Sequence, residues 1–228
     1  MTSRRATVTE RDEGPGFAER IREQTSVAHR ETNESRFVSA LLDGELNVDG
    51  YAALLAQTYL VYTKLEDAGR SHAHDDLVAL FLAEELLRVP ALEADLEFLL
   101  GPNWRSTITA LPATTKYLDR LDEVAFDWPV GFVAHHYIRY LGDLSGGQIV
   151  RRKLEHAYGF RTEGVQFYTF DGIPKPKPFK DAYRMRLDSA PLSEQDRQDL
   201  IGEVHLAYRL NGELFADLEA DIESYLVK

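Results

Sequence analysis

The chain has 228 residues, of which 44% are hydrophobic and 28% charged, and its formal net charge is −12. This length and composition fit one globular domain, and the acidic balance argues against a nucleic-acid partner, because phosphate binding needs clustered cations. The sequence has no cysteine, which excludes disulfides, thiolate metal ligands and cysteine nucleophiles. Since the lack of cysteine also fits a reducing compartment, we expect a cytoplasmic protein.

The N-terminal residues contain paired arginines but no apolar stretch behind them. We therefore predict that residues 1–15 are a disordered leader and not an export signal. No segment approaches the roughly 18 consecutive apolar residues of a membrane span, so we expect a soluble protein with no membrane partner. Residues 16–228 are predicted to form the folded domain.

Along the chain, these residues show mainly the three- and four-residue spacing of amphipathic helices. The predicted helices span about 17–34, 35–42, 49–69, 76–88, 92–100, 115–124, 129–158 and 179–187, and Ser193 caps a last long helix. Gly44 and Gly101 stand where a helix should stop. Residues 159–178 are predicted to be irregular, with a weak strand-like run at 166–170. The fold class is therefore predicted to be all-α.

Three glycines interrupt the predicted helix at 129–158, and each costs a helix about 1 kcal/mol relative to alanine. Gly142 and Gly146 are four residues apart, so they share one face, and Gly147 flanks them. A face without side chains lets a flat group approach the backbone and permits a bend. The alternative is close packing of another helix against small residues.

Asp143 follows Arg139 by four residues, so the two side chains point to the same side of this helix. A solvated ion pair is one interpretation. The neighbouring residues are mostly apolar or aromatic, however, and a carboxylate beside a glycine face can hold water and relay protons.

Three histidines are candidate metal ligands. His29 lies on or next to the apolar face of the first predicted helix; such a histidine is more often a hydrogen-bonded core residue than a ligand. His135 and His136 adjoin the glycine-bearing helix and are rivals on spacing alone. The segment 72–76 holds two histidines and two aspartates, but it falls in a predicted loop, which favours solvated side chains over a metal site.

Residues 151–186 form a basic island, with nine Lys and Arg against four Asp and Glu. Within it, Lys180 and Arg184 are like charges four residues apart, which is unfavourable unless an anion lies between them. Together with Lys175 and Lys177 they can clamp carboxylates, although a solvated helix face fits the spacing equally well.

Five segments together resemble one enzyme family. RYLGDLSGGQ at 139–148 closely resembles the distal-helix signature of the haem oxygenases, and IREQTSVAHRETNESRF at 21–37 resembles their proximal helix. Segments at 59–66, 179–189 and 206–219 follow in the family's order, so the resemblance covers nearly the whole chain. It implies a helical bundle that binds haem between a proximal and a kinked distal helix. It further implies oxidation of haem by O2 and external electrons to biliverdin, carbon monoxide and ferrous iron.

The resemblance also implies which residues act on haem. The glycines would lie over the ring on its oxygen-binding side, and the polar residues would organise the water there. The residues assigned to catalysis are Asp143, Arg139, Gly142, Gly146 and Tyr62.

For haem binding, the resemblance implies that His29 ligates the iron. Four further side chains would meet the haem propionates, namely Arg22, Tyr137, Lys180 and Arg184. The electron donor implied is a ferredoxin or a flavoprotein reductase, and we expect a monomer. Whether the role is iron acquisition or pigment synthesis stays open.

Two positions depart from the family pattern. Asn33 stands where the family often has a glutamate that orients the ligand imidazole, and an amide leaves that imidazole less anionic. Ser26 replaces a basic residue on the propionate side.

Three other functions are alternatives to a haem oxygenase. A haem carrier or gas sensor of the same fold would need His29 but not Asp143. A thiaminase-type hydrolase needs a cysteine, and a di-iron bundle needs Glu-x-x-His motifs; the chain has neither.

Overall fold

The computed structural model describes residues 15–227, with the exception of the side chain of Asn33. All but the last residue of the predicted leader, and the interaction expected of Asn33, therefore lie outside the described residues. The α-helices are α1 (Phe17–Gln24), α2 (Ser26–Asn33), α3 (Arg36–Leu42), α4 (Val48–Ser71), α5 (Val89–Leu100), α6 (Pro112–Val124), α7 (Pro129–Tyr158), α8 (Pro176–Ser189), α9 (Glu194–Ala220) and α10 (Ile222–Tyr225). Single 3-10 turns form η1 (Val78–Leu80), η2 (Glu84–Leu86), η3 (Trp104–Ser106) and η4 (Gln166–Tyr168).

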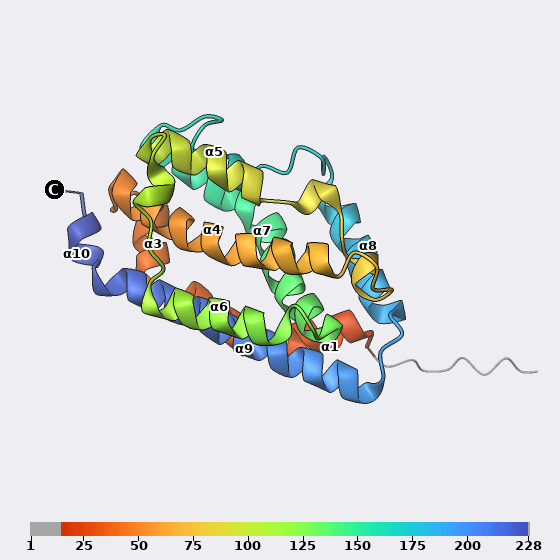
Figure 1. The fold of residues 1–228 in the computed structure, drawn as a ribbon. Coiled ribbons are helices and arrows are strands. Elements are labelled where there is room, and N and C mark those ends of the chain that lie inside the picture. The colour runs from red at the N-terminus through yellow and green to blue at the C-terminus, as the bar shows by residue number, and fades with distance from the viewer. Residues whose placement is uncertain (1–14, 228) are drawn as a thin grey trace, which may run out of the picture.

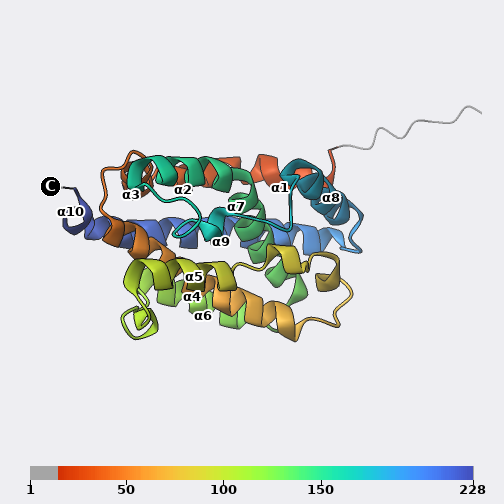
Figure 2. The ribbon, with the colours of Figure 1, turned by 90° about the horizontal axis from the view of Figure 1, so that it is seen from above.

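Helices α1, α2, α3, α6 and α7 all pack against α9, which runs along the lower edge of the molecule in Figure 1. On one side of α9 lie α4, α5 and α6, and on the other side lie α1, α2, α3 and the second half of α7 (Figure 2). Within the described residues, β pairing is limited to one bridge between Leu46 and Leu226. The all-α prediction is confirmed. None of the described helices is both long and apolar enough to cross a membrane.

The predicted helix at 129–158 matches α7 at both ends. Pro129 occupies its first turn, where the missing N–H is not needed, and Gly159 ends it in a left-handed conformation with φ +72°. The second half of the helix runs in a different direction from the first (Figure 2). The glycines at 142, 146 and 147 therefore lie within one continuous helix that bends.

The first predicted helix, at 17–34, is divided into α1 and α2 at Thr25. The Thr25 hydroxyl donates to the carbonyl of Ile21 at 2.8 Å, and this kind of bond to the preceding turn bends helices. The division gives α2, which carries His29, a direction of its own.

The predicted helix at 76–88 is wrong, because the segment contains only the turns η1 and η2. Carboxylates bind its backbone N–H groups at both ends. Asp75 accepts from Leu77 and Val78 at 3.0 and 2.9 Å, and Glu66 accepts from Arg88 at 2.6 Å. The Arg88 side chain in turn donates to the carbonyl of Leu86 at 3.0 Å. These bonds satisfy backbone groups that a continuous helix would otherwise pair.

The strand-like run at 166–170 is also not a strand; it forms η4. Asp95 on α5 holds it by accepting from the N–H groups of Gln166 and Phe167 at 3.0 and 2.8 Å. This anchoring places Phe167 and Tyr168 against α4 and α7.

Candidate functional site

The glycines of α7 differ in what surrounds them. A Cβ atom added at Gly142 or Gly146 would meet no described atom within 4 Å, whereas one added at Gly147 would lie 3.3 Å from the ring of Tyr168. Close packing therefore explains Gly147 alone. At Gly142 and Gly146 the bare backbone is open to a flat group.

Beside this open face, the polar residues form a connected group. The Tyr62 hydroxyl on α4 donates to the carboxylate of Asp143. The Arg139 guanidinium lies 5.0 Å from the centre of the Tyr62 ring and donates from Nη1 to Asn211 at 2.7 Å. Its Nε is buried and has no hydrogen-bond partner among the described residues. Arg139 thus belongs to a polar network with Tyr62 and Asn211, and it is not a solvated helix-surface cation.

Burial sets the protonation of this group. It raises the pKa of Asp143, while the positive charge of Arg139 and the hydrogen bond from Tyr62 act in the opposite direction. Burial, together with the negative charge of Asp143, raises the pKa of Tyr62 well above its ordinary value. Tyr62 therefore stays protonated and donates, and a carboxyl group with a raised pKa is suited to take up and pass on a proton.

Behind Tyr62 lies a second carboxylate, which the sequence analysis did not identify. Oε1 of Glu66 accepts from the N–H groups of Arg88 and Val89 at 2.6 and 3.0 Å and from the Tyr140 hydroxyl at 3.4 Å. The Tyr140 ring packs edge-on against Tyr62, with 5.2 Å between the centroids. Glu66 follows Tyr62 by four residues on α4, and that spacing was the available signal.

His29 lies on α2, is exposed, and makes an edge-to-face contact with Tyr208 of α9 at 5.6 Å. The Thr32 hydroxyl donates to the Tyr208 carbonyl at 3.1 Å, which fixes this part of α2 on α9. The contacts with α9 therefore fix the position of α2, the helix that carries the His29 imidazole.

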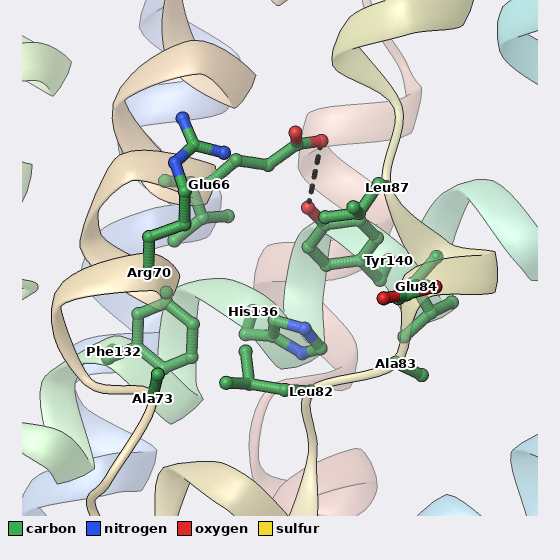
Figure 3. A pocket seen from close by; sticks show the side chains of 13 residues that line it. Glu66, Arg70, Ala73, Leu82, Ala83, Glu84, Leu87, Phe132, His136 and Tyr140 are labelled. Atoms are coloured by element: carbon green, nitrogen blue, oxygen red, sulfur yellow. Dashed lines mark hydrogen bonds between the residues drawn. The ribbon is translucent and has the colours of Figure 1, made fainter.

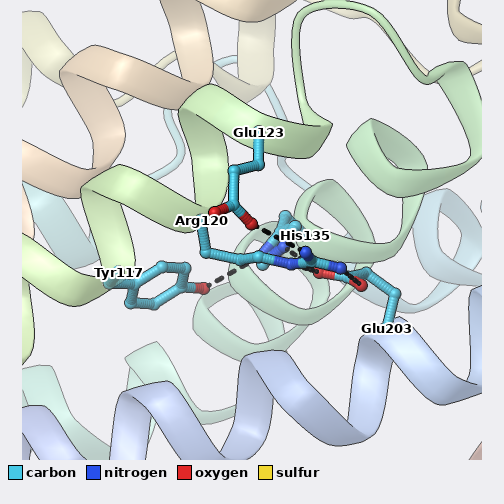
Figure 4. A network of polar contacts seen from close by, with 5 residues as sticks. All are labelled: Tyr117, Arg120, Glu123, His135 and Glu203. Carbon is cyan, nitrogen blue, oxygen red and sulfur yellow. Dashed lines mark hydrogen bonds and ion pairs between the residues drawn. The ribbon is translucent and has the colours of Figure 1, made fainter.

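The rival histidines are engaged elsewhere. His135 is fully buried, with Nε2 2.9 Å from Glu203 and Nδ1 3.3 Å from the hydroxyl of Tyr117 (Figure 4). Burial lowers the pKa of His135, so the neutral ring donates to the Glu203 carboxylate and accepts from Tyr117. Nδ1 of His136 lies 2.9 Å from the hydroxyl of Tyr183. Both rings are buried in the core, so neither is placed to ligate iron at a surface site.

In the histidine-rich segment 72–76, two side chains make hydrogen bonds to the backbone that stabilise the fold. Nε2 of His72 lies 2.9 Å from the carbonyl of Ala125, and Asp75 accepts from the backbone at the start of η1. In the part of the chain that the structure describes, no three His, Asp or Glu side chains are grouped as metal ligands.

Four predicted propionate-binding side chains gather from three helices. Lys180 on α8 donates to the hydroxyl of Ser145, between the two open glycines of α7, at 3.0 Å. Burial raises the pKa of Tyr137, and the nearby positive charges of Arg184 and Arg22 act against this rise. Partial burial and the charge of Arg184 lower the pKa of Lys180. Tyr137 is therefore within electrostatic reach of Arg22 and Arg184, and Lys180 is within reach of Arg184.

The outer members of this group also have acidic partners. Arg22 pairs with Glu19 at 3.0 Å, and Arg184 pairs with Asp181 at 3.0 Å. Lys177 reaches the same Asp181 at 2.9 Å but is largely exposed. These surface pairs are weak enough to exchange for an anionic ligand.

A flat backbone face, a partly buried carboxyl–tyrosine pair beside it and a cluster of cations at one end define an α-helical protein with a site that suits a flat, anionic molecule. The family model described as "Heme oxygenase" matches residues 15–217, and the chain belongs to the haem oxygenase family.

Relatives and solved structures agree with this family. The chain is 36% identical over 206 residues to the "Heme oxygenase" of Rhodella violacea, covering 90% of this chain and 88% of the relative. It is 36% identical over 207 residues to "Heme oxygenase 1" of Rattus norvegicus, covering 90% and 72%. Heme oxygenase-1 of the cyanobacterium Synechocystis, solved in complex with heme, superposes with a TM-score of 0.87 at 32% identity, over 92% of this chain and 95% of that one. The family and fold predicted from the sequence are confirmed.

Proposed function

We propose that this protein is a haem oxygenase that opens haem to biliverdin, carbon monoxide and ferrous iron, using O2 and electrons from an external donor. Family membership supports the reaction class. The observation that carries the proposal for this chain is the open backbone face at Gly142 and Gly146, directly beside the hydrogen-bonded pair of Asp143, which is partly buried, and Tyr62, which is buried.

The residues present fit haem as the bound molecule. A planar ring can approach the backbone at Gly142 and Gly146, because no described atom occupies the space that their side chains would fill. Lys180 reaches the same stretch of α7, so carboxylates at the ring edge would meet cations there. We assign His29 as the iron ligand, since its side chain is exposed, whereas His135 and His136 are buried in the core.

The chain itself would contribute position and protons. Haem, when bound, supplies the iron that activates oxygen. Lys180, Arg184, Tyr137 and Arg22 would hold the propionates and so set the orientation of the ring. Asp143, held by the Tyr62 hydroxyl, would keep water beside the glycine face and pass protons there.

A haem carrier or gas sensor is the second candidate, and the Asp143–Tyr62 pair speaks against it. A protein that only binds haem does not need a carboxyl group on the oxygen side that a tyrosine hydroxyl holds in place and whose pKa is raised. Delivery of protons to the oxygen-binding side would give the Asp143–Tyr62 pair a function.

The test is to add haemin to the protein and follow the Soret band, then to add ascorbate or a reductase system. The proposal expects loss of the Soret band together with the appearance of biliverdin absorbance. Stable reduced haem with no biliverdin would show a carrier. A ferredoxin or flavoprotein reductase as donor, a monomeric state and a cytoplasmic location stay predictions.

A further inference from the structure

A cavity of about 300 Å³ lies between α4, α7 and residues 82–87 (Figure 3). Its lining includes Leu65, Leu82, Leu86, Phe132, His136 and Tyr140. None of the ten residues assigned above to haem binding or catalysis lines it. The volume is at the lower end for small-molecule sites.

The cavity is on a different face of α7 from the open glycines. Phe132, His136 and Tyr140 follow at intervals of four residues, so they share one side of the helix. Gly142 comes two residues after Tyr140, which is about 200° around the helix axis. A molecule in the cavity would therefore not occupy the glycine face.

His136 places a ring nitrogen among the apolar side chains that line most of the cavity. The residue is 3% exposed, and Nδ1 is engaged with the Tyr183 hydroxyl at 2.9 Å. Nε2 makes no hydrogen bond with any residue that the structure describes. Since His136 lines the cavity, Nε2 is the nitrogen that a bound molecule can reach (Figure 3).

The remaining walls limit the chemistry of a ligand. Leu65 and Leu86 are each 1% exposed, and with Phe132 they form apolar surface that favours an aromatic ring. The lining also includes Glu66 and Arg70, but Glu66 already accepts from backbone N–H groups and Arg70 pairs with Asp67. A charged molecule would lose its hydration against the apolar walls, so an uncharged one is favoured. A hydroxyl group can either donate to Nε2 or accept from it, so it suits both tautomers of His136.

We propose that this cavity is a second ligand site, which binds a small uncharged aromatic molecule of about two fused rings through one hydroxyl group directed at Nε2 of His136.

The test uses 2-naphthol and, as a matched probe without a hydroxyl, naphthalene, with binding followed by ligand-observed NMR titration. Titrations are run on the protein alone and on protein saturated with haemin. We expect 2-naphthol to bind about 3- to 10-fold more tightly than naphthalene, which corresponds to one hydrogen bond. Haemin should leave this binding unchanged. Displacement by haemin, or no binding of either probe, would overturn the proposal.

Two pairs of variants locate the site. Ala83→Phe places a ring in the cavity and should abolish binding, whereas Ala79→Phe adds the same bulk to an exposed residue of the same segment, outside the cavity lining, and should not. In His136→Phe, 2-naphthol and naphthalene should bind about equally tightly. Tyr183→Phe removes only the hydrogen bond to Nδ1 and should leave the preference for 2-naphthol unchanged.

Thermal unfolding verifies that each variant is folded. If His136→Phe does not fold, the Ala83 and Ala79 pair decides the location alone. Undiminished binding in Ala83→Phe, or an unchanged preference in folded His136→Phe, contradicts the proposal. These results do not depend on turnover, so a failure here is separate from a failure of the proposed function.

Discussion

The protonated state of single residues decides how this site can work. Asp143 is the residue on which the choice between enzyme and carrier depends, because it is the partly buried carboxyl group beside the open glycines and its pKa is raised. Its hydrogen bond from Tyr62 fixes where it points.

We predict that Asp143→Ala binds haemin within about threefold of the wild type, because the proposed ligand and the cationic cluster are unchanged. Its biliverdin yield should fall about 100-fold or more, the usual effect of losing a general acid. Asp143→Asn should keep part of the activity, since an amide still positions water. Haemin titration and biliverdin absorbance measure both effects. Full biliverdin production by Asp143→Ala would place proton delivery elsewhere, with Arg139 and Tyr62 the next residues to replace.

The iron ligand is also a question of one residue. We predict that His29→Ala loses the spectrum of histidine-ligated haem, whereas His136→Ala and His135→Ala keep it. His135→Ala should nevertheless lower the free energy of unfolding by about 2 kcal/mol, because the buried Glu203 would lose the hydrogen bond from His135 while keeping Arg120. The absorption spectrum with haemin and chemical denaturation separate the two effects. An unchanged spectrum in His29→Ala would exclude it as the ligand.

Among the elements, α7 combines two kinds of glycine that a sequence pattern treats alike. We predict that Gly142→Ala and Gly146→Ala each raise the stability of the haem-free protein by about 1 kcal/mol, because the added methyl meets no described atom and alanine favours the helix. Each should weaken haem binding or turnover. Gly147→Ala is the control, since its methyl would press on Tyr168. Denaturation of the three variants tests this; a loss of stability at Gly142 would indicate helix packing.

Helices α1, α7 and α8 meet at the cationic cluster. We predict that charge reversal at both Lys180 and Arg184 weakens haem affinity or lets the ring rotate, which would mix the biliverdin isomers. Lys177→Glu is the matched control, because Lys177 is exposed and pairs with the same Asp181. Haemin titration and chromatography of the products measure the two effects. Unchanged affinity with one unchanged isomer would remove these residues from the site.

For the whole molecule, two buried groups give opposite pH dependences of stability. Burial raises the pKa of Asp95 to about 6, against the bonds from Phe167 and Gln166, so its charged form costs stability above pH 6 and this cost disappears as the pH falls towards 4. Burial lowers the pKa of His136 to about 3, so only the unfolded chain binds that proton between about pH 6.5 and 3. Stability from His136 is therefore lost as the pH falls through that range.

Each group contributes a slope of about 1.4 kcal/mol per pH unit, with opposite signs, between pH 4 and 6. We predict that Asp95→Asn makes the acid loss of stability steeper, and that His136→Phe makes it shallower. Urea denaturation at intervals from pH 4 to 7.5 measures the slopes. Identical slopes in the wild type and both variants would contradict the assignment.

The sequence by itself determined most of the helices and the family, and it supplied the residues of the proposed site. Periodicity and end signals such as Ser193 and Gly159 act over a few residues, so they are visible without the fold. Tertiary structure alone decided what depends on contacts between distant segments. Glu66 binds the backbone of Arg88, which prevents the helix predicted at 76–88. Glu203 engages His135, and Tyr168 crowds Gly147 but not Gly142. The ring nitrogens of adjacent histidines and the space above adjacent glycines differ only through such neighbours, and helical spacing carries no information about them.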